Sequence, residues 1–339
     1  MIASVHPITY DQILKDIREK KFAPVYFLMG DEPYFIDVIS DTIEEEALDE
    51  TQKAFNQIIM YGRDVDVDTI ANNARSFPMM GDRMVVIVKE AQDVKNIEEF
   101  DKYLDVIPPT TVLVFAYKYK KLDKRKSFAK QIDKRGVLFE SKKLYDNNIP
   151  QWISNYMAEA GYSITPKATQ MLADYLGTDL HKVCNELKKL TIALPNRKRI
   201  DDEDVERNIG ISKDFNVFEL QNALGMRDVL KANRIVNYFA DNAKDTPLLV
   251  TAIALYGFFT KLLKAHYATD KSQGGLATAL GVNPFFVKDY MGALRNYSIA
   301  DCVRCIGVLR EYELKAVGYN VGDTGEKDLY REMLFKLIH

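Results

Sequence analysis

The sequence predicts an α/β domain at the front of the chain, followed by a region built only of helices. Residues 1–142 alternate short apolar runs, rich in β-branched and aromatic residues, with helical stretches. Such unalternated strands are typical of a parallel sheet that is covered on both faces. After Lys142 the strand signals stop, and the remaining segments follow a 3.6-residue period broken by Pro, Gly and Asn. A chain of 339 residues suggests roughly two or three domains.

Five strands and four helices are predicted for the front of the chain. The strands are expected at 24–29, about 54–61, 83–89, 110–116 and 136–141. The helices between them are expected at about 33–48, 66–75, 97–105 and 124–133. The first strand ends in glycine, and Pro33 suits the first turn of the helix that follows.

The remaining helices have recognisable starts and stops. Thr165 and Pro166 open one helix as cap and first residue, and Gly177 closes it. Asp179 opens the next helix, and 200–210 is a short helix with an acidic cap. Longer helices fill 217–339, with breaks near 241–246, 270–275 and 281–284. We therefore predict three domains, at 1–142, 143–211 and 212–339.

The first strand and turn look like a nucleotide-binding element without its chemistry. PVYFLMG (24–30) leads into a helix almost at once, whereas a phosphate-binding loop would read G-x-x-x-x-G-K-S/T. Two carboxylates, Asp31 and Glu32, stand where an anion would bind. Lys89 follows the third strand at the place where a Walker B strand has an acid for Mg²⁺. The sequence therefore predicts no ATP hydrolysis and no cofactor in this chain.

A short apolar connection precedes the third strand. Phe77, Pro78, Met79 and Met80 lie between the helix ending near Arg75 and the strand at 83–89. Connections usually run over the surface, and four apolar side chains on one of them are hard to bury together. Phe77 and one methionine could plug the edge of the sheet. Alternatively, the segment could be an exposed apolar element that docks in a pocket of a partner.

A basic run with interleaved tyrosines follows the fourth strand. Its cations are Lys118, Lys120, Lys121, Lys124, Arg125, Lys126, Lys130, Lys134 and Arg135. Cations beside Tyr117 and Tyr119 could hold a nucleic-acid backbone and stack bases. The other interpretation is the solvated face of one helix leading into a strand.

The other candidate sites have ordinary explanations. Cys302 and Cys305 form a C-x-x-C pair inside a helical pattern, and the only other cysteine is Cys184, so we predict core cysteines and no metal site. The four histidines are scattered and suggest no catalytic group. Few cysteines and no signal-peptide core indicate the reducing cytoplasm. No apolar run approaches the roughly 18–20 residues that span a bilayer, so no membrane contact is expected.

Several segments, in this order, resemble the delta subunit family of the bacterial DNA polymerase III clamp loader. The resemblance rests on PVYFLMGDEPYFI (24–36), SFPMMGDRMVVIVKEA (76–91) and TVLVFAYKYKKLDKRKSFAKQI (111–132). It continues in DLHKVCNELKKL (179–190), IDDEDVERNIG (200–210) and FNVFELQNAL (215–224). The chain has neither the Ser-Arg-Cys arginine finger nor the four-cysteine zinc module of related loader subunits.

The resemblance implies a degenerate AAA+ domain with a helical lid and a helical collar. It implies a subunit that hydrolyses no ATP, binds the ring-shaped sliding clamp (beta) and holds one interface open for loading onto primed DNA. The family's apolar contact pair falls on Met79 and Met80, with Phe77 and Pro78 shaping the approach. Many members carry leucine or phenylalanine there, so two methionines keep the apolar volume but lose the rigid aromatic. DNA polymerase activity would belong to this chain only through the holoenzyme.

The family's other partners are the loader's ATPase subunits and the delta-prime subunit, which the collar would join. The inner face of the assembled loader could also meet DNA. Possible DNA-facing residues are Lys120, Lys121, Lys124 and Arg125.

Two other classes of protein stay open at the level of sequence. One is a working, helicase-loader-like AAA+ ATPase, which ATP-dependent thermal stabilisation would favour. The other is a DNA-binding regulator that uses the C-terminal helices, which tight, salt-dependent duplex binding would favour. The formal net charge of −3 argues mildly against the second.

Overall fold

The computed structural model describes residues 8–79, 81–322 and 324–339. The chain divides into two compact units, Met1–Leu144 and Tyr145–His339. Each unit encloses its own buried apolar clusters. The predicted boundary at 211/212 falls inside the second unit and stays a prediction.

The first unit is built on a five-stranded sheet. Its strands are β1 (Val25–Gly30), β2 (Gln57–Tyr61), β3 (Met84–Lys89), β4 (Thr111–Lys118) and β5 (Val137–Ser141). The order is β2-β3-β4-β1-β5, and all neighbours are parallel. β1 is buried at every position because helices cover both of its faces. The predicted parallel sheet is confirmed.

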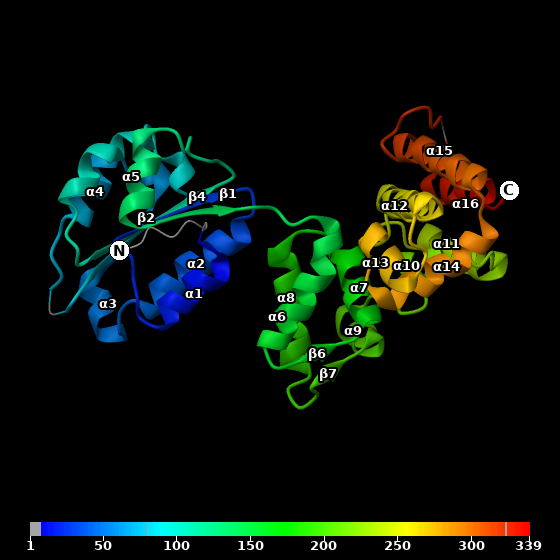
Figure 1. Cartoon of the computed structure of the whole chain (residues 1–339), viewed down its shortest axis with the longest axis horizontal. Helices are drawn as coiled ribbons and strands as arrows, with labels where there is room; N and C mark the ends of the chain where they lie inside the picture. Colours follow the sequence, from blue (N-terminus) through cyan, green and yellow to red (C-terminus); the bar gives the residue numbers. More distant parts are fainter. Residues whose placement is uncertain (1–7, 80, 323) are drawn as a thin grey trace. The chain divides into compact units, whose positions relative to one another are not determined.

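Helices form a layer on each face of this sheet (Figure 1). α1 (Tyr10–Arg18) and α2 (Pro33–Glu46) share one buried cluster with the sheet. On the other face, α4 (Val67–Ala74), the 3₁₀ helix η3 (Ile97–Val106) and α5 (Ser127–Arg135) share a second cluster. The remaining short helices are α3 (Glu50–Asn56), η1 (Gly62–Asp64) and η2 (Ala91–Asp93).

The strand predicted at about 54–61 is wrong at its start. Residues up to Asn56 belong to α3, and β2 begins at Gln57. The helix forms because the Asp49 side chain accepts a hydrogen bond from the Gln52 amide at its N-terminus. The stretch predicted as a helix at 97–105 is a 3₁₀ helix, and α1 was not predicted.

The second unit is almost entirely helical. Its helices are α6 (Ile149–Glu159), α7 (Pro166–Leu176), α8 (Leu180–Ala193), α9 (Asp202–Ile209), α10 (Val217–Gly225), α11 (Val229–Asp241), α12 (Leu248–Tyr267), α13 (Gln273–Leu280), α14 (Val287–Asn296), α15 (Ile299–Ala316) and α16 (Glu326–Ile338). Short 3₁₀ helices are η4 (Asp146–Asn148) and η5 (Pro284–Phe286). The predicted absence of strands is corrected by a two-residue pair, β6 (Ser163–Ile164) with β7 (Arg199–Ile200).

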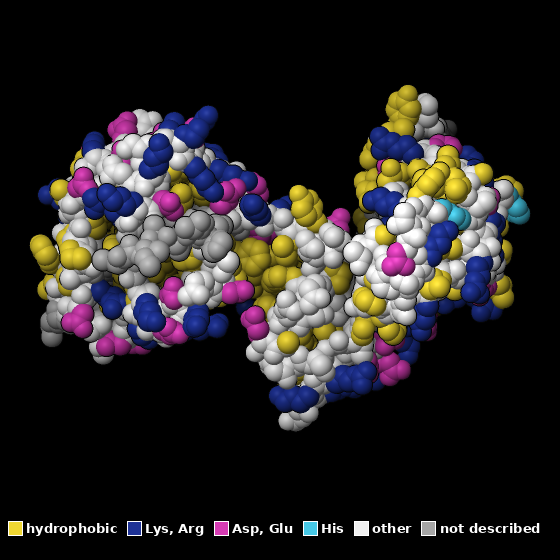
Figure 2. Space-filling view, viewed as in Figure 1, with side chains coloured by type: hydrophobic (Ala, Val, Ile, Leu, Met, Phe, Trp, Pro, Cys, Tyr) yellow, Lys and Arg dark blue, Asp and Glu magenta, His cyan; other side chains and the backbone are white. Residues whose placement is uncertain are grey.

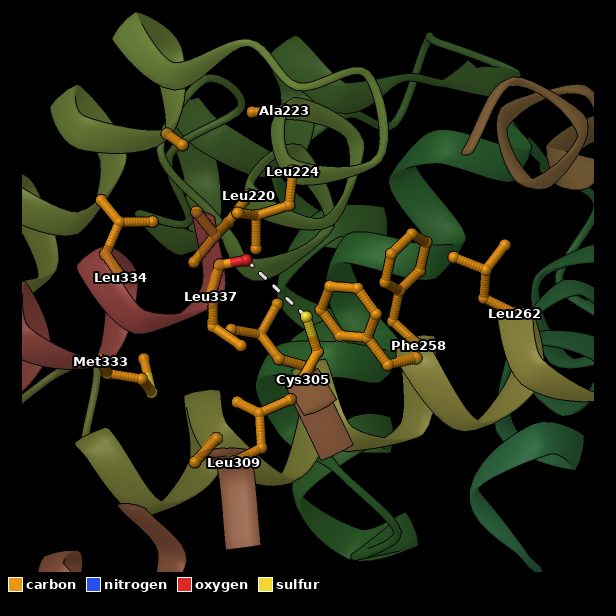
Figure 3. Packing of buried hydrophobic residues seen from close by; sticks show 14 of the residues in the cluster. Leu220, Ala223, Leu224, Phe258, Leu262, Cys305, Leu309, Met333, Leu334 and Leu337 are labelled. Carbon is orange, nitrogen blue, oxygen red and sulfur yellow. Dashed lines mark hydrogen bonds between the residues drawn. The ribbon is translucent and has the colours of Figure 1, made fainter. Parts of the chain in front are cut away.

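The largest buried cluster lies between α10, α11, α12, α15 and α16. Figure 3 shows Leu337 of α16 beside Cys305 of α15, with Phe258 and Leu262 of α12 in the same cluster. The Cys305 Sγ lies 3.7 Å from the Leu337 carbonyl oxygen. Cys302 is also fully buried, and burial raises the pKa of both thiols to about 11. The prediction of core cysteines is confirmed.

One helix among the described residues, α12, is long and apolar enough to cross a membrane by length and composition alone. This corrects the expectation that no apolar run in the chain approaches the length of a membrane span. The core helix of a helical domain passes the same test, because it is apolar on most sides. Leu255, Phe259 and Leu262 of α12 are fully buried in the cluster with α15, so α12 serves as a core helix.

A cavity of about 950 Å³ lies within the second unit and is lined by residues of α6, α7, α10, α12, α13 and α14. Asp174 of α7 and Lys261 of α12 both line it. The Asp174 carboxylate accepts a 2.7 Å hydrogen bond from the Gln170 side chain. Burial raises the pKa of Asp174 to about 6, and it lowers the pKa of Lys261.

We expect Asp174→Asn to stabilise the second unit at pH 7 by about 1–2 kcal/mol. The folded state binds a proton at Asp174 more tightly than the unfolded state, so the wild type loses stability as the pH rises from about 4 to above 6. The Asp174→Asn variant does not lose this stability, because asparagine carries no titrating carboxyl group. Chemical denaturation at several pH values measures it, with the exposed Asp245→Asn as control. An unchanged pH dependence in Asp174→Asn would refute this assignment.

Candidate functional site

The turn after β1 closes on the protein's own backbone. The Gly30 N–H donates to the Lys120 carbonyl (3.1 Å), and the Asp31 N–H donates to the Ser141 carbonyl (3.0 Å). Gly30 has a φ of +133°, and a Cβ there would lie 2.0 Å from the Ser141 oxygen, so only glycine fits. The two backbone amides of this turn are therefore already hydrogen-bonded within the chain.

The N-terminus of α2 holds a carboxylate of the chain itself. Glu32 is buried, and its side chain accepts a hydrogen bond from the Tyr34 amide at 3.2 Å. The Ser141 hydroxyl donates to the Glu32 carbonyl at 2.7 Å, which fixes the turn against β5. Because a helix N-terminus favours negative charge, Glu32 occupies the position that suits a bound phosphate.

Ion pairs fill the edge of the sheet where strands β3 and β4 end. The Lys89 ammonium lies 3.1 Å from Asp41 and 2.8 Å from Glu44, both on α2. The Lys118 ammonium lies 2.7 Å from both Asp37 and Glu90. The sequence places Lys89 where a magnesium ligand would stand. The structure shows that the carboxylates of Asp41 and Glu44 neutralise this cation.

Lys118 is the more buried of these two lysines, with its side chain 13% exposed. Burial lowers its pKa, but the hydrogen bonds to Asp37 and Glu90 outweigh burial and raise it overall. Burial raises the pKa of Glu90, but the hydrogen bonds from Lys118 and Gln92, together with the charge of Lys118, outweigh burial and hold this pKa below its ordinary value. The edge is thus held in a charged, paired state by the chain's own side chains.

The apolar connection between α4 and β3 presents side chains to solvent. Phe77 is 76% exposed and Met79 is 63% exposed, while Pro78 is half-buried. Met80 lies outside the described residues. Of the two interpretations of this segment, a plug made of Phe77 is wrong, because its ring does not cover the sheet edge. Two large exposed apolar side chains so close in the chain form a candidate contact surface.

The backbone of this connection is anchored by Asn56, at the end of α3. The Asn56 Nδ2 donates to the Met79 carbonyl at 2.7 Å, and the Met79 N–H donates to the Asn56 Oδ1 at 2.6 Å. Asn56 is fully buried. Figure 1 shows α3 beside the connection that leads from α4 to β3. The sequence analysis misses Asn56 because it places this residue in a strand. The signal for a helix was present, because Asp49 is a typical helix cap seven residues before Asn56.

The four possible DNA-facing residues all make contacts within the chain. Lys121 lies 2.6 Å from Asp31, and both Lys121 and Lys124 reach Glu140. The Lys120 ammonium donates to a backbone carbonyl, and Arg125 pairs with the neighbouring Asp123. Figure 2 shows basic side chains interspersed with acidic ones on the visible face of the first unit. DNA contact by these residues stays a prediction.

No cluster of three or more His, Cys, Asp or Glu side chains in residues 8–79, 81–322 and 324–339 could hold a metal ion. The geometry defines a class: a parallel α/β sheet whose first turn is closed by hydrogen bonds within the chain, carrying an exposed apolar element.

Comparisons with known proteins narrow this class. Residues 26–142 match the family model of the DNA polymerase III delta subunit. DNA polymerase III subunit delta of Bacillus subtilis (strain 168) is 27% identical over 342 residues, which cover 96% of this chain and 94% of that protein. The solved structure of the Bacillus subtilis DNA clamp loader delta protein matches 97% of this chain and 99% of its own, with a TM-score of 0.54 and 24% identity. At that identity, the structural match bears on the fold alone.

A RuvB branch migration motor of Thermotoga maritima also matches, with 14% identity over 85% of each chain, but its TM-score of 0.36 is too low to carry a conclusion. The predicted resemblance to DNA polymerase III delta subunits is confirmed over nearly the whole chain. By sequence, the chain is thus similar to DNA polymerase III delta subunits.

Proposed function

We propose that this chain binds the sliding clamp and holds one interface of the ring open, so that the clamp can be loaded onto primed DNA. The contact is the apolar element Phe77, Pro78, Met79 and Met80. The observation that carries the proposal is the exposure of Phe77 and Met79 on a connection whose backbone is anchored by Asn56. Exposing two large apolar side chains is unfavourable in water, and burial in a pocket of the clamp would recover that free energy.

The contact would contribute free energy toward ring opening. Fully burying one methionine or phenylalanine side chain contributes about 1.5–3 kcal/mol. Contacts of this strength open a ring only if they are better in the open form than in the closed form, because a ligand shifts an equilibrium only by its differential affinity. The proposal therefore requires that the apolar element binds the open form of the clamp more tightly than the closed form.

The chain contributes no ATP chemistry of its own. The bonded amides of Gly30 and Asp31, the Glu32 carboxylate and the paired Lys89 support this part of the proposal. ATP binding by neighbouring subunits would uncover the apolar element, and hydrolysis would reset it. DNA polymerase activity accordingly belongs to the holoenzyme.

The partners follow from this role. Residues 212–339 form the collar that joins the chain to the ATPase subunits and delta-prime, with 143–211 as the lid. Primed DNA is met within the assembled loader, in the cytoplasm. Exposed apolar residues of α12, such as Val250 and Ile253, are available for helix–helix packing.

Opening of the clamp tests the proposal. The clamp carries one fluorophore on each side of an interface, so that the pair quenches itself when the ring is closed. Adding the wild-type chain without ATP is expected to raise the fluorescence, and the Phe77→Ala/Met79→Ala variant is expected to leave it low. Ile192→Ala, which removes an equally exposed apolar side chain elsewhere, serves as control. Binding of the wild type with no change in quenching would refute ring opening.

A further inference from the structure

The anchoring of the apolar element points to a positioning residue outside it. Asn56 is separated by 23 residues from Met79, yet its side-chain amide pairs with both backbone groups of that residue. A side-chain amide that donates to a carbonyl and accepts from the same residue's N–H fixes the backbone in one orientation, as a bridge between two strands does. The hydrogen bonds are short, at 2.7 and 2.6 Å.

The surroundings of Asn56 hold its side chain in turn. It is fully buried at the junction between α3 and β2, so its own position is set by the sheet. Gly81 lies so close that a Cβ there would be 2.9 Å from the Asn56 Nδ2 and 3.3 Å from the Gln52 side chain. A side chain at position 81 would therefore push against the paired amide, and glycine leaves room for it.

We propose that Asn56 is a positioning residue for clamp binding, an inference that rests on the proposed function. Asn56 touches no clamp residue itself. It holds the Met79 backbone, so that Phe77 and Met79 are presented in the geometry that the clamp pocket takes up. Without it, the connection would have to be ordered during binding, and ordering a backbone costs conformational entropy at each residue.

Hydrogen exchange of the wild-type chain tests the anchor without any clamp. The Met79 amide is expected to exchange at least about tenfold more slowly than the Phe77 amide, although both belong to an exposed connection. Equal exchange rates at the two amides would overturn the inference. This measurement needs no variant, so it does not depend on whether a substitution at Asn56 folds.

Clamp binding by Asn56→Ala tests the role. We expect affinity to fall about tenfold. The variant is measured at a temperature where its thermal unfolding curve shows it to be folded, because truncating a fully buried side chain also lowers stability. In the Phe77→Ala/Met79→Ala background, Asn56→Ala should weaken residual binding far less than in the wild type, since it acts only through those side chains. Gly81→Ala is expected to weaken binding in the same direction.

The outcomes separate this inference from the proposed function. Wild-type affinity in Asn56→Ala, or an equal loss in both backgrounds, would overturn the positioning role while clamp binding stands. If the wild-type chain did not bind the clamp, both the proposed function and the positioning role would be refuted. A slowly exchanging Met79 amide would then still show that the anchor is a structural feature of the free chain.

Discussion

Replacing Phe77 and Met79 together by alanine is expected to weaken clamp binding by about 30-fold or more, which corresponds to about 2 kcal/mol. The two side chains are 76% and 63% exposed, so their loss should leave the fold intact. The expected effect is large because interface anchors commonly contribute most of the binding energy of a contact. Equilibrium binding to immobilised clamp measures it, and the thermal unfolding midpoint checks that the variant is folded.

Two further variants refine this result. Ile192→Ala removes an apolar side chain of matching exposure from α8 and is expected to bind like the wild type. Adding Met80→Ala to the double variant tests whether that residue belongs to the contact, as the family resemblance implies. If the double variant bound the clamp as tightly as the wild type, the apolar element would be misplaced even though the clamp remained a partner.

Replacing Lys118 by methionine is expected to destabilise the first unit by about 2–3 kcal/mol. Methionine keeps the apolar stem but leaves the carboxylates of Asp37 and Glu90 without their cation in a largely buried place. Breaking a buried ion pair from one side is more costly than losing an exposed pair, because an uncompensated charge remains. Lys130→Met, an exposed lysine on α5, is the matched control and should change stability little.

The pH dependence of this effect has a definite sign. The pKa of Glu90 is lowered in the folded chain, so its pairing stabilises the fold above the ordinary value of 4.5 and is lost as the pH falls below it. The difference between wild type and Lys118→Met should therefore shrink in acid. Urea denaturation at pH 7 and pH 4 measures it. An equal difference at both pH values would show that the ion pair is not its cause.

The sequence predicts the central strands well because they are buried on both faces. β1, β3 and β4 are runs of apolar residues, and each lies within one or two residues of its expected place. β5 lies at one edge of the sheet and is buried only at alternate positions, and it too begins within one residue of its expected place. The edge strand β2 is harder to place, because Ile59 and Tyr61 are exposed and its first residues continue from a helix. α1 was missed although Thr9 caps it and Ile13, Leu14 and Ile17 have helical spacing, so here the signal was present.

The candidate site was predictable only in part. Apolar residues in a short connection are visible in the sequence, which leaves open whether they are buried or exposed. The partners of the site are not visible, because they come from distant segments. Lys89 meets Asp41 from 48 residues away, and Met79 meets Asn56 from 23 residues away. Pairing over such separations is decided by the order of strands in the sheet, which composition and periodicity do not encode.

Calorimetric titration of the wild-type chain with the sliding clamp of its own organism, without nucleotide, tests the central claim most directly. The account predicts saturable binding with no ATP present, because the apolar element belongs to this chain and the nucleotide site is filled by its own side chains. A folded chain that gives no binding signal, or that binds only when ATP is added, would contradict it.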